Sequence, residues 1–142
     1  PYSITHVSHG LFFALFFGAL GRWLAGRGFD RAQDWRWHLA LGVGVAAAWE
    51  IAENSAAVIE RYRTVTMSLN YMGDSILNAT GDVLSCVLGF FIARHLGLWK
   101  TLALFAATEL LLLWLIRDNL TLNIIMLLHP IDAIREWQAA GR

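Results

Sequence analysis

The sequence predicts an all-α integral membrane protein: a bundle of four transmembrane helices followed by a re-entrant or amphipathic helix at the membrane interface. Hydrophobic residues make up 57% of the 142 residues and charged residues only 15%, whereas a soluble domain has about 25% charged residues. Four apolar stretches approach the roughly 20 helical residues that cross a bilayer. We expect residues 1–142 to form a single membrane domain, because the helices need one another to bury their polar faces.

The four predicted spans follow one another along most of the chain. The first is the shortest, and Arg22 near its end is placed to extend towards the lipid headgroups. Most of the seven Trp residues lie near span ends, as an aromatic belt at the membrane interface requires. The predicted spans are residues 8–24, 37–58, 73–96 and 98–117.

The remaining segment, residues 119–140, begins with an apolar run that is too short to cross a bilayer. His129 and Pro130 interrupt this run, and Ile131, Ile134 and Trp137 then follow with helical spacing. We expect a re-entrant or interfacial segment followed by an amphipathic helix.

Basic residues predict the orientation of the bundle. Arg22, Arg27, Arg31 and Arg36 surround the connection between the first two spans, and Arg94 and Lys100 flank the turn between the last two. The positive-inside rule places these connections in the cytoplasm. If the spans alternate in direction, the other ends of all four meet on the periplasmic side.

Acidic residues gather at those other ends. Spacings of three and four place Glu50, Glu53 and Glu60 on one stripe of the second span, beside Asn54. Carboxylates in a row within a membrane repel one another, so a positive partner is required. An arginine such as Arg63 gives a structural ion pair, and a metal or a ligand gives a functional site.

Asp74, Asn78 and Asp82 recur at steps of four at the start of the third span. Oxygen ligands in a row suit a hard cation such as Mg²⁺ or Ca²⁺. The same residue types form hydrogen-bond ladders between membrane helices, and both interpretations remain open.

His6 and His9 lie three residues apart at the entrance of the first span. Together with Glu50, Glu53 or Asp74 they could form a zinc or iron site of nitrogen and oxygen ligands. Their alternative role is ordinary hydrogen bonding at the interface. The candidates for a catalytic role are His9, Glu50 and Asp74, with His9 as base or ligand.

The end of the fourth span carries Arg117, Asp118 and Asn119. The Arg117 guanidinium is expected to face the acids of the second and third spans, where it could also hold a phosphate or carboxylate at two points. Glu109, near the middle of the same span, is expected to be neutral and hydrogen-bonded.

The charge balance and the single cysteine exclude some classes of function. The formal net charge is zero and no basic stripe occurs, so we expect no nucleic-acid partner. Cys86 lies within a predicted span and is expected to pack as a small apolar side chain. The chain begins with Pro1 rather than Met, and we expect an upstream segment to be missing.

Several motifs together resemble an uncharacterised family of bacterial inner-membrane proteins that is catalogued only as a domain of unknown function. They are WEIAEN (49–54), IERYR (59–63), YMGDSILN (71–78), IRDNLTLNI (116–124) and HPIDAI (129–134). The resemblance implies a multi-pass protein of the bacterial inner (plasma) membrane whose relatives have one more upstream segment and a Cys-x-Cys-Gly stretch. More loosely, the chain is similar to VanZ-like membrane proteins, which favours a lipid-linked or envelope substrate.

The function predicted from these features is an outward-facing intramembrane polar pocket that binds a lipid headgroup, an envelope amphiphile or a divalent metal. No reaction is assigned to it. The alternative is an accessory subunit that packs against a larger membrane complex and uses its polar residues only for helix association. Residues predicted to contribute to binding are Glu53, Asn54, Arg63, Asn78, Asp82, Arg117, Asp118 and Asn119; the metal candidates are His6, His9, Glu50 and Asp74.

Overall fold

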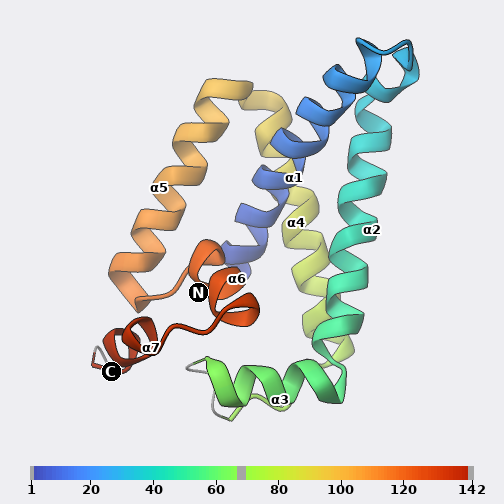
Figure 1. The fold of residues 1–142 in the computed structure, drawn as a ribbon. Coiled ribbons are helices and arrows are strands. Elements are labelled where there is room, and N and C mark those ends of the chain that lie inside the picture. The colour runs from blue at the N-terminus through green and yellow to red at the C-terminus, as the bar shows by residue number, and fades with distance from the viewer. Residues whose placement is uncertain (1, 67–69, 141–142) are drawn as a thin grey trace.

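All regular secondary structure in the computed structural model, which describes residues 2–66 and 70–140, is helical. Figure 1 shows the arrangement of the helices. They are α1 (Tyr2–Ala25), the 3-10 helix η1 (Asp30–Gln33), α2 (Trp35–Glu53), α3 (Ala56–Val65), α4 (Ile76–Leu96), α5 (Leu98–Ile116), α6 (Leu120–Leu128) and α7 (Asp132–Ala139). The all-α class predicted from the sequence is confirmed.

Three of the described helices are long and apolar enough to cross a membrane, namely α1 over Ile4–Ala25, α4 and α5. The second predicted span corresponds to α2, whose 19 residues reach about 28 Å. Arg36, His38 and Glu50 make α2 less apolar than the other three helices. The structure therefore supports three spans by composition, and α2 runs beside two of them, α1 and α4 (Figure 1).

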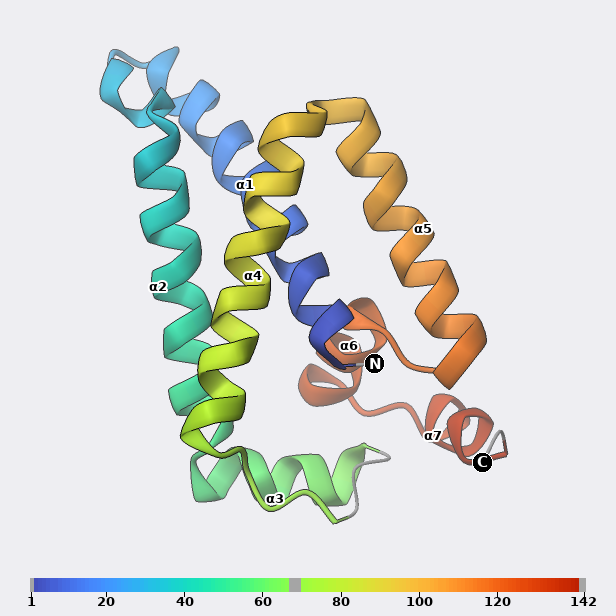
Figure 2. The ribbon, with the colours of Figure 1, turned by 180° about the vertical axis from the view of Figure 1, so that it is seen from behind.

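Helix α1 packs most extensively against α4, and small residues make this possible. A Cβ atom on Gly10 would overlap the backbone carbonyl of Cys86, and one on Gly89 would overlap that of Val7. Glycine at such positions lets two membrane helices approach backbone to backbone. Figure 2 shows α1 lying against α4 from the opposite side of the molecule.

Helix α5 is joined to α4 by a tight turn and then leans away from the bundle (Figure 1). Gly97 adopts a φ of 73° at this turn, and the buried Thr101 hydroxyl donates to the carbonyl of Gly97 at 2.7 Å. Farther along, the hydroxyls of Ser8 and Thr108 lie 3.1 Å apart and connect α5 to α1.

The second predicted span does not continue to residue 58. Helix α2 ends at Glu53, and the Ser55 hydroxyl accepts from the amide of Val58 to start α3. Figure 1 shows that α3 lies across the lower end of the bundle rather than along it. The predicted stripe of three acids on one helix is therefore wrong, because Glu60 is an exposed residue of α3.

The third span begins three residues later than the predicted residue 73. Gly73 has a φ of 88°, which is incompatible with a right-handed helix, and the Ser75 hydroxyl then accepts from the amide of Asn78 at 3.2 Å. Asp74 consequently belongs to a turn that precedes α4. The fourth span, α5, ends at Ile116, within one residue of the prediction.

The C-terminal segment forms two short helices separated at His129 and Pro130, as the sequence predicts. Asn119 caps the start of α6, where its Oδ1 accepts from the amide of Leu122 at 2.8 Å. Helix α6 folds back towards the start of α1 and also contacts α3. Helix α6 thus contacts both α1 and α3 at the lower end of the bundle, where the polar residues gather.

Candidate functional site

A pocket of about 970 Å³ lies at the lower end of the bundle, among residues of α1 to α6 and the turn before α4. One part of its wall is polar and the other is apolar. The polar part includes His6, His9, Glu50, Glu53, Tyr62, Tyr71, Asp74, Asn78 and Asp82. The apolar part includes Phe12, Phe13, Val45, Phe105, Ile124 and Ile125.

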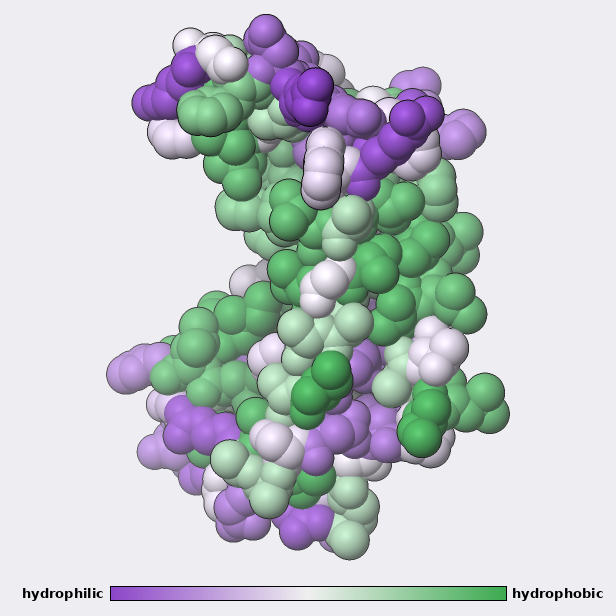
Figure 3. All heavy atoms as spheres, turned by 90° about the vertical axis from the view of Figure 1, so that its right-hand side faces the viewer, coloured by the Kyte–Doolittle hydropathy of each residue, from purple (hydrophilic) through white to green (hydrophobic). Residues whose placement is uncertain are grey.

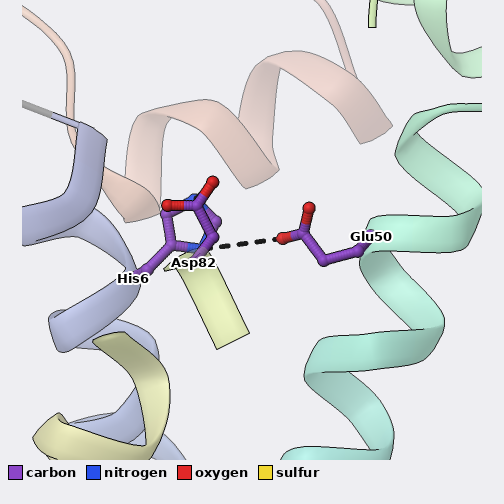
Figure 4. A group of neighbouring side chains, drawn as sticks. All are labelled: His6, Glu50 and Asp82. Carbon is purple, nitrogen blue, oxygen red and sulfur yellow. Dashed lines mark ion pairs between the residues drawn. The ribbon is translucent and has the colours of Figure 1, made fainter. Parts of the chain in front are cut away.

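Three residues from three different helices form the centre of the polar part. Figure 4 shows the carboxylate of Glu50 reaching from α2 towards His6 of α1 and Asp82 of α4. Nδ1 of His6 lies 3.7 Å from Oε1 of Glu50, and Nε2 of His6 lies 3.7 Å from Oδ2 of Asp82. One ligand atom from each residue can be chosen so that all three lie within 4.8 Å of one another.

Two buried polar atoms at or beside this centre have no hydrogen-bond partner among the residues that the structure describes. They are Oε2 of Glu50 and Nδ1 of His9. Glu50 is only 7% exposed, so water does not solvate its carboxylate freely. The ring of His9 lies 5.1 Å from that of His6, one helical turn along α1. An unpaired buried carboxylate oxygen is costly and indicates a missing partner.

A ladder of hydrogen bonds connects Asp82 to the turn before α4. The side-chain nitrogen Nδ2 of Asn78 donates to Oδ1 of Asp74 at 2.8 Å and to Oδ2 of Asp82 at 3.0 Å. The step-of-four spacing thus forms a ladder within one helix and its leading turn, rather than between helices. It holds the Asp82 carboxylate against the centre of the site.

Asn54 joins the end of α2 to the same turn. Its side-chain nitrogen Nδ2 donates to the backbone carbonyl of Glu50 at 2.8 Å, and its Oδ1 accepts from the backbone amide of Asp74 at 2.6 Å. A Cβ atom on Gly73 would lie 2.8 Å from this Oδ1. Asn54 is therefore a positioning residue: it does not line the pocket, but it fixes the turn that carries Asp74 against the end of α2.

Two tyrosines complete the polar wall, and neither is among the site residues predicted from the sequence. The Tyr71 hydroxyl lies 2.9 Å from Oδ2 of Asp74 and 3.2 Å from Oε1 of Glu53, so one phenolic proton serves two carboxylates. Burial, followed by the charge of Glu53, raises the pKa of Tyr71 above its usual range. The Tyr62 hydroxyl donates to Asn123 at 3.2 Å, and burial likewise raises its pKa.

A signal for Tyr71 is present in the sequence. It lies three residues before Asp74, in the turn that positions the acids. Tyr62, on α3, reaches the pocket only because the chain turns at Asn54. That turn lies within a stretch predicted to be one continuous helix.

No lysine or arginine among the described residues forms an ion pair with these acids. Arg63 donates to the carbonyl of Tyr71 at 2.6 Å and contacts the sulfur of Met72. Arg117 donates to the carbonyl of Trp137 at 2.8 Å and lies over its ring. The structure places Arg117 against α7, so it does not oppose the acids as the sequence analysis expects.

Asp118 and Asn119 lie outside the described pocket wall. Asp118 accepts from Gln138 at 3.3 Å, and Asn119 caps α6. Glu109 is also structural, because its carboxylate accepts from the backbone amides of Leu120 and Thr121 at 3.3 and 2.9 Å. The first amides of a helix have no partner within the helix, and Glu109 supplies one for two of them.

Comparison with known proteins assigns a family and no activity. Residues 1–140 match the model of a family described as "Protein of unknown function (DUF2585)". A UPF0314 protein of Paracoccus denitrificans is 49% identical over 139 residues, which are 98% of this chain and 67% of the relative. A UPF0314 protein of Sphingopyxis alaskensis is 48% identical over 141 residues, 99% of this chain and 70% of the relative.

A third relative, UPF0314 protein R03235 of Rhizobium meliloti, is 46% identical over 138 residues, 97% of this chain and 66% of the relative. The chain thus spans about two thirds of the length of these relatives. No solved structure matches it. The resemblance to an uncharacterised family is confirmed; these matches name no VanZ-like protein, so that likeness stays a prediction.

Proposed function

Because the chain belongs to the DUF2585 family, whose function is unknown, we propose a function from the pocket itself. The protein is a multi-pass protein of the bacterial inner membrane that binds the polar head of a lipid or another envelope amphiphile in an outward-facing pocket. The observation that carries this proposal is the joining of a carboxylate and imidazole cluster to an apolar wall within one pocket.

Helix α2 is the fourth span in this proposal. It runs beside α1 and α4, and its length of 19 residues matches that of α5. Figure 3 shows, on the face that carries α2, a largely hydrophobic band between two hydrophilic ends. The polar residues of α2 that lower its hydropathy lie near its two ends, where a span meets water or the pocket.

The distribution of arginine supports the outward direction. Arg22, Arg27, Arg31 and Arg36 lie at the end of the bundle opposite the pocket, together with Arg94. The pocket then opens on the side away from the cytoplasm. Helix α6, with nine residues, is too short to cross and completes the pocket as a re-entrant segment, while α7 lies at the interface.

The chemistry of the wall defines the class of ligand. Phe12, Phe105 and Ile124 offer apolar contacts that suit an acyl or isoprenoid chain. The polar end holds four carboxylates and no described arginine, so it favours a head that is cationic or donates hydrogen bonds. A head with a phosphate or carboxylate needs a metal ion between itself and the acids.

Filling the apolar part of the pocket tests this proposal. We expect Ala46→Trp to reduce the amphiphile retained by the purified protein at least about tenfold, or 1.4 kcal/mol, because the indole occupies the space of the chain. Native mass spectrometry in a mild detergent measures the retained mass. Ala48→Trp, on an exposed position of the same helix, is the matched control and should bind as the wild type does.

Equal retention in Ala46→Trp and Ala48→Trp, or a wild-type protein that carries no amphiphile, would count against the pocket. The second candidate, an accessory subunit, is favoured by the exposed apolar face of α5, where Trp114 is 79% and Leu110 66% exposed. Membrane lipids cover such a face equally well. A stoichiometric partner protein in the same spectra would favour the subunit.

A further inference from the structure

We propose that His6, Glu50 and Asp82 bind one divalent first-row transition-metal ion, with open coordination positions that face the pocket. The inference deepens the proposed function and rests on the same pocket, because the metal supplies the positive charge that its polar end lacks. It differs from the candidate set of the sequence analysis, in which Asp74 and His9 accompany His6 and Glu50.

The geometry of the three side chains fits a shared ion. Metal–ligand distances of about 2.0–2.2 Å place two ligand atoms roughly 3–4 Å apart. Both nitrogen–oxygen distances are 3.7 Å, too long for a hydrogen bond, but they start from different nitrogens of the His6 ring, only one of which can bind a given ion. With one ligand atom taken from each residue, the three atoms lie within 4.8 Å of one another, so a small movement of the side chains brings them around one ion. The side chains of Glu50 and Asp82 are each 8% exposed, and that of His6 is 17% exposed.

A second, independent observation points to a ligand at this place. Among the described residues, Oε2 of Glu50 has no hydrogen-bond partner although the residue is more than nine-tenths buried. Figure 4 shows the Glu50 carboxylate directed towards His6 and Asp82, and Oε1 is the oxygen 3.7 Å from His6. Native proteins rarely leave a buried carboxylate oxygen without a partner. A metal ion bound by both oxygens of the Glu50 carboxylate would pair Oε2 as well as Oε1 and would draw the three side chains together.

The simpler interpretation is a protonated imidazole that bridges two carboxylates. One positive charge on His6 would face Glu50 and Asp82 directly, with Glu53 and Asp74 close behind. Arg61 and Arg63, on α3, donate to the backbone carbonyls of Leu127 and Tyr71 and pair with none of these acids. A divalent ion balances this excess of negative charge better than one imidazolium does.

The donor set selects the kind of metal. One imidazole nitrogen and two carboxylates suit Zn²⁺, Mn²⁺ or Fe²⁺, whereas Mg²⁺ and Ca²⁺ prefer oxygen ligands alone. Three protein ligands leave at least one coordination position for another molecule. Asn78 donates to Asp82 at 3.0 Å and so holds one ligand in place from outside. Asp74 is left out of the set because Tyr71 and Asn78 bond to both of its oxygens, whereas Asn78 bonds to only one oxygen of Asp82.

The open position faces a pocket that is apolar on its other side. A metal there takes an anionic oxygen from the pocket, so the ligand class becomes an amphiphile headed by a phosphate or carboxylate. The four carboxylates alone would repel such a head.

The experiment uses the purified protein in mild detergent, freed of metal with a chelator and titrated separately with ZnCl₂, MnCl₂ and CoCl₂. Calorimetry and elemental analysis give affinity and stoichiometry, and the visible spectrum of Co²⁺ reports its ligands. We expect about one ion per chain, and a loss of affinity of at least about tenfold in Glu50→Gln, Asp82→Asn and His6→Lys. His6→Lys keeps a positive charge but removes the ligand, so it separates the metal from the imidazolium bridge.

The matched controls are His95→Gln, an exposed histidine of α4, and Asp30→Asn, an exposed acid of η1. Both should bind metal as the wild type does. Binding that is absent for all three ions, or unchanged in the three ligand variants, overturns the proposal. If a ligand variant loses its helical circular dichroism, X-ray absorption of the Zn²⁺-loaded wild type replaces that variant in the test. A coordination shell that contains no imidazole nitrogen would overturn the proposed metal site.

Native mass spectra of the chelated and metal-loaded protein distinguish the two proposals. Bound amphiphile without stoichiometric metal overturns the metal site and leaves the pocket function standing. Bound metal without amphiphile, at any lipid concentration used, overturns the pocket function and supports the metal site.

Discussion

At the scale of single residues, the site depends on a turn whose conformation only glycine adopts easily. Gly73 has a φ of 88°, and its missing Cβ leaves room for the side chain of Asn54. Asn54 in turn fixes the backbone of Asp74. The spacing of Asp74, Asn78 and Asp82 could be read from the sequence, but the role of Asn54 could not, because its partners are backbone atoms distant in the chain.

We expect Gly73→Ala to disturb the site as well as the fold. A left-handed alanine costs about 1–2 kcal/mol, and its Cβ would also displace Asn54 and loosen Asp74. Unfolding in detergent measures the first effect, and amphiphile retention measures the second.

Gly28→Ala is the matched control for that prediction. Gly28 has a φ of 92° and no atom near the position of a Cβ. It should show a similar loss of stability with normal retention. Normal retention in Gly73→Ala would show that Asn54 does not position the turn.

For Glu109, the sequence predicts a hydrogen-bonded carboxyl group within an apolar helix, but it does not predict the groups that bond to it. A carboxylate in the middle of an apolar stretch predicts either a neutral hydrogen-bonded group or a functional site. The structure shows that the amides at the start of α6 pair with it. The reason lies in the return of the chain after Ile116, which no local pattern specifies.

At the scale of elements, the close packing of α1 on α4 sets the position of His6 relative to Asp82. The two helices meet at Gly10 and Gly89, where the backbones touch. Small residues in apolar helices predict close contact in general. Which glycines meet is decided by the crossing geometry, since Gly81 and Gly44 have open space around them.

We expect Gly89→Ala to destabilise the protein by about 1–3 kcal/mol, because the new methyl group overlaps the carbonyl of Val7. Thermal or detergent unfolding followed by circular dichroism measures this change. Gly81→Ala on the same helix meets open space and should not destabilise the protein, because alanine favours a helix over glycine by about 1 kcal/mol. Equal stability of the two variants would mean that α1 and α4 do not touch at Gly89.

The break between α2 and α3 shows how an element boundary was missed. Residues 50–58 read as a continuous helix because their acids and apolar residues keep helical spacing. Asn54 and Ser55 nevertheless end one helix and cap the next. Asparagine followed by serine is a weak boundary signal, and it prevails here because Asn54 bonds to the turn before α4.

At the scale of the whole molecule, the proposed topology places the pocket outside the cytoplasm. Gly28 lies in the arginine-rich connection at one end, and the exposed Ala56 begins α3 at the other. We expect a membrane-impermeant maleimide to label Ala56→Cys in intact cells, and Gly28→Cys only after permeabilisation. The buried Cys86 contributes little background. The reverse pattern would place the pocket in the cytoplasm.

The sequence by itself determined the membrane class, the helical structure and the approximate bounds of three spans. These follow from local composition, because a bilayer requires about 20 apolar residues in a helix whatever their neighbours. It also determined which residue types gather at one end. The tertiary structure decided that α3 crosses this end, that Arg117 turns to α7, and that His6, Glu50 and Asp82 meet. Such meetings depend on how three helices cross, and the packing that sets the crossing joins residues far apart in the chain.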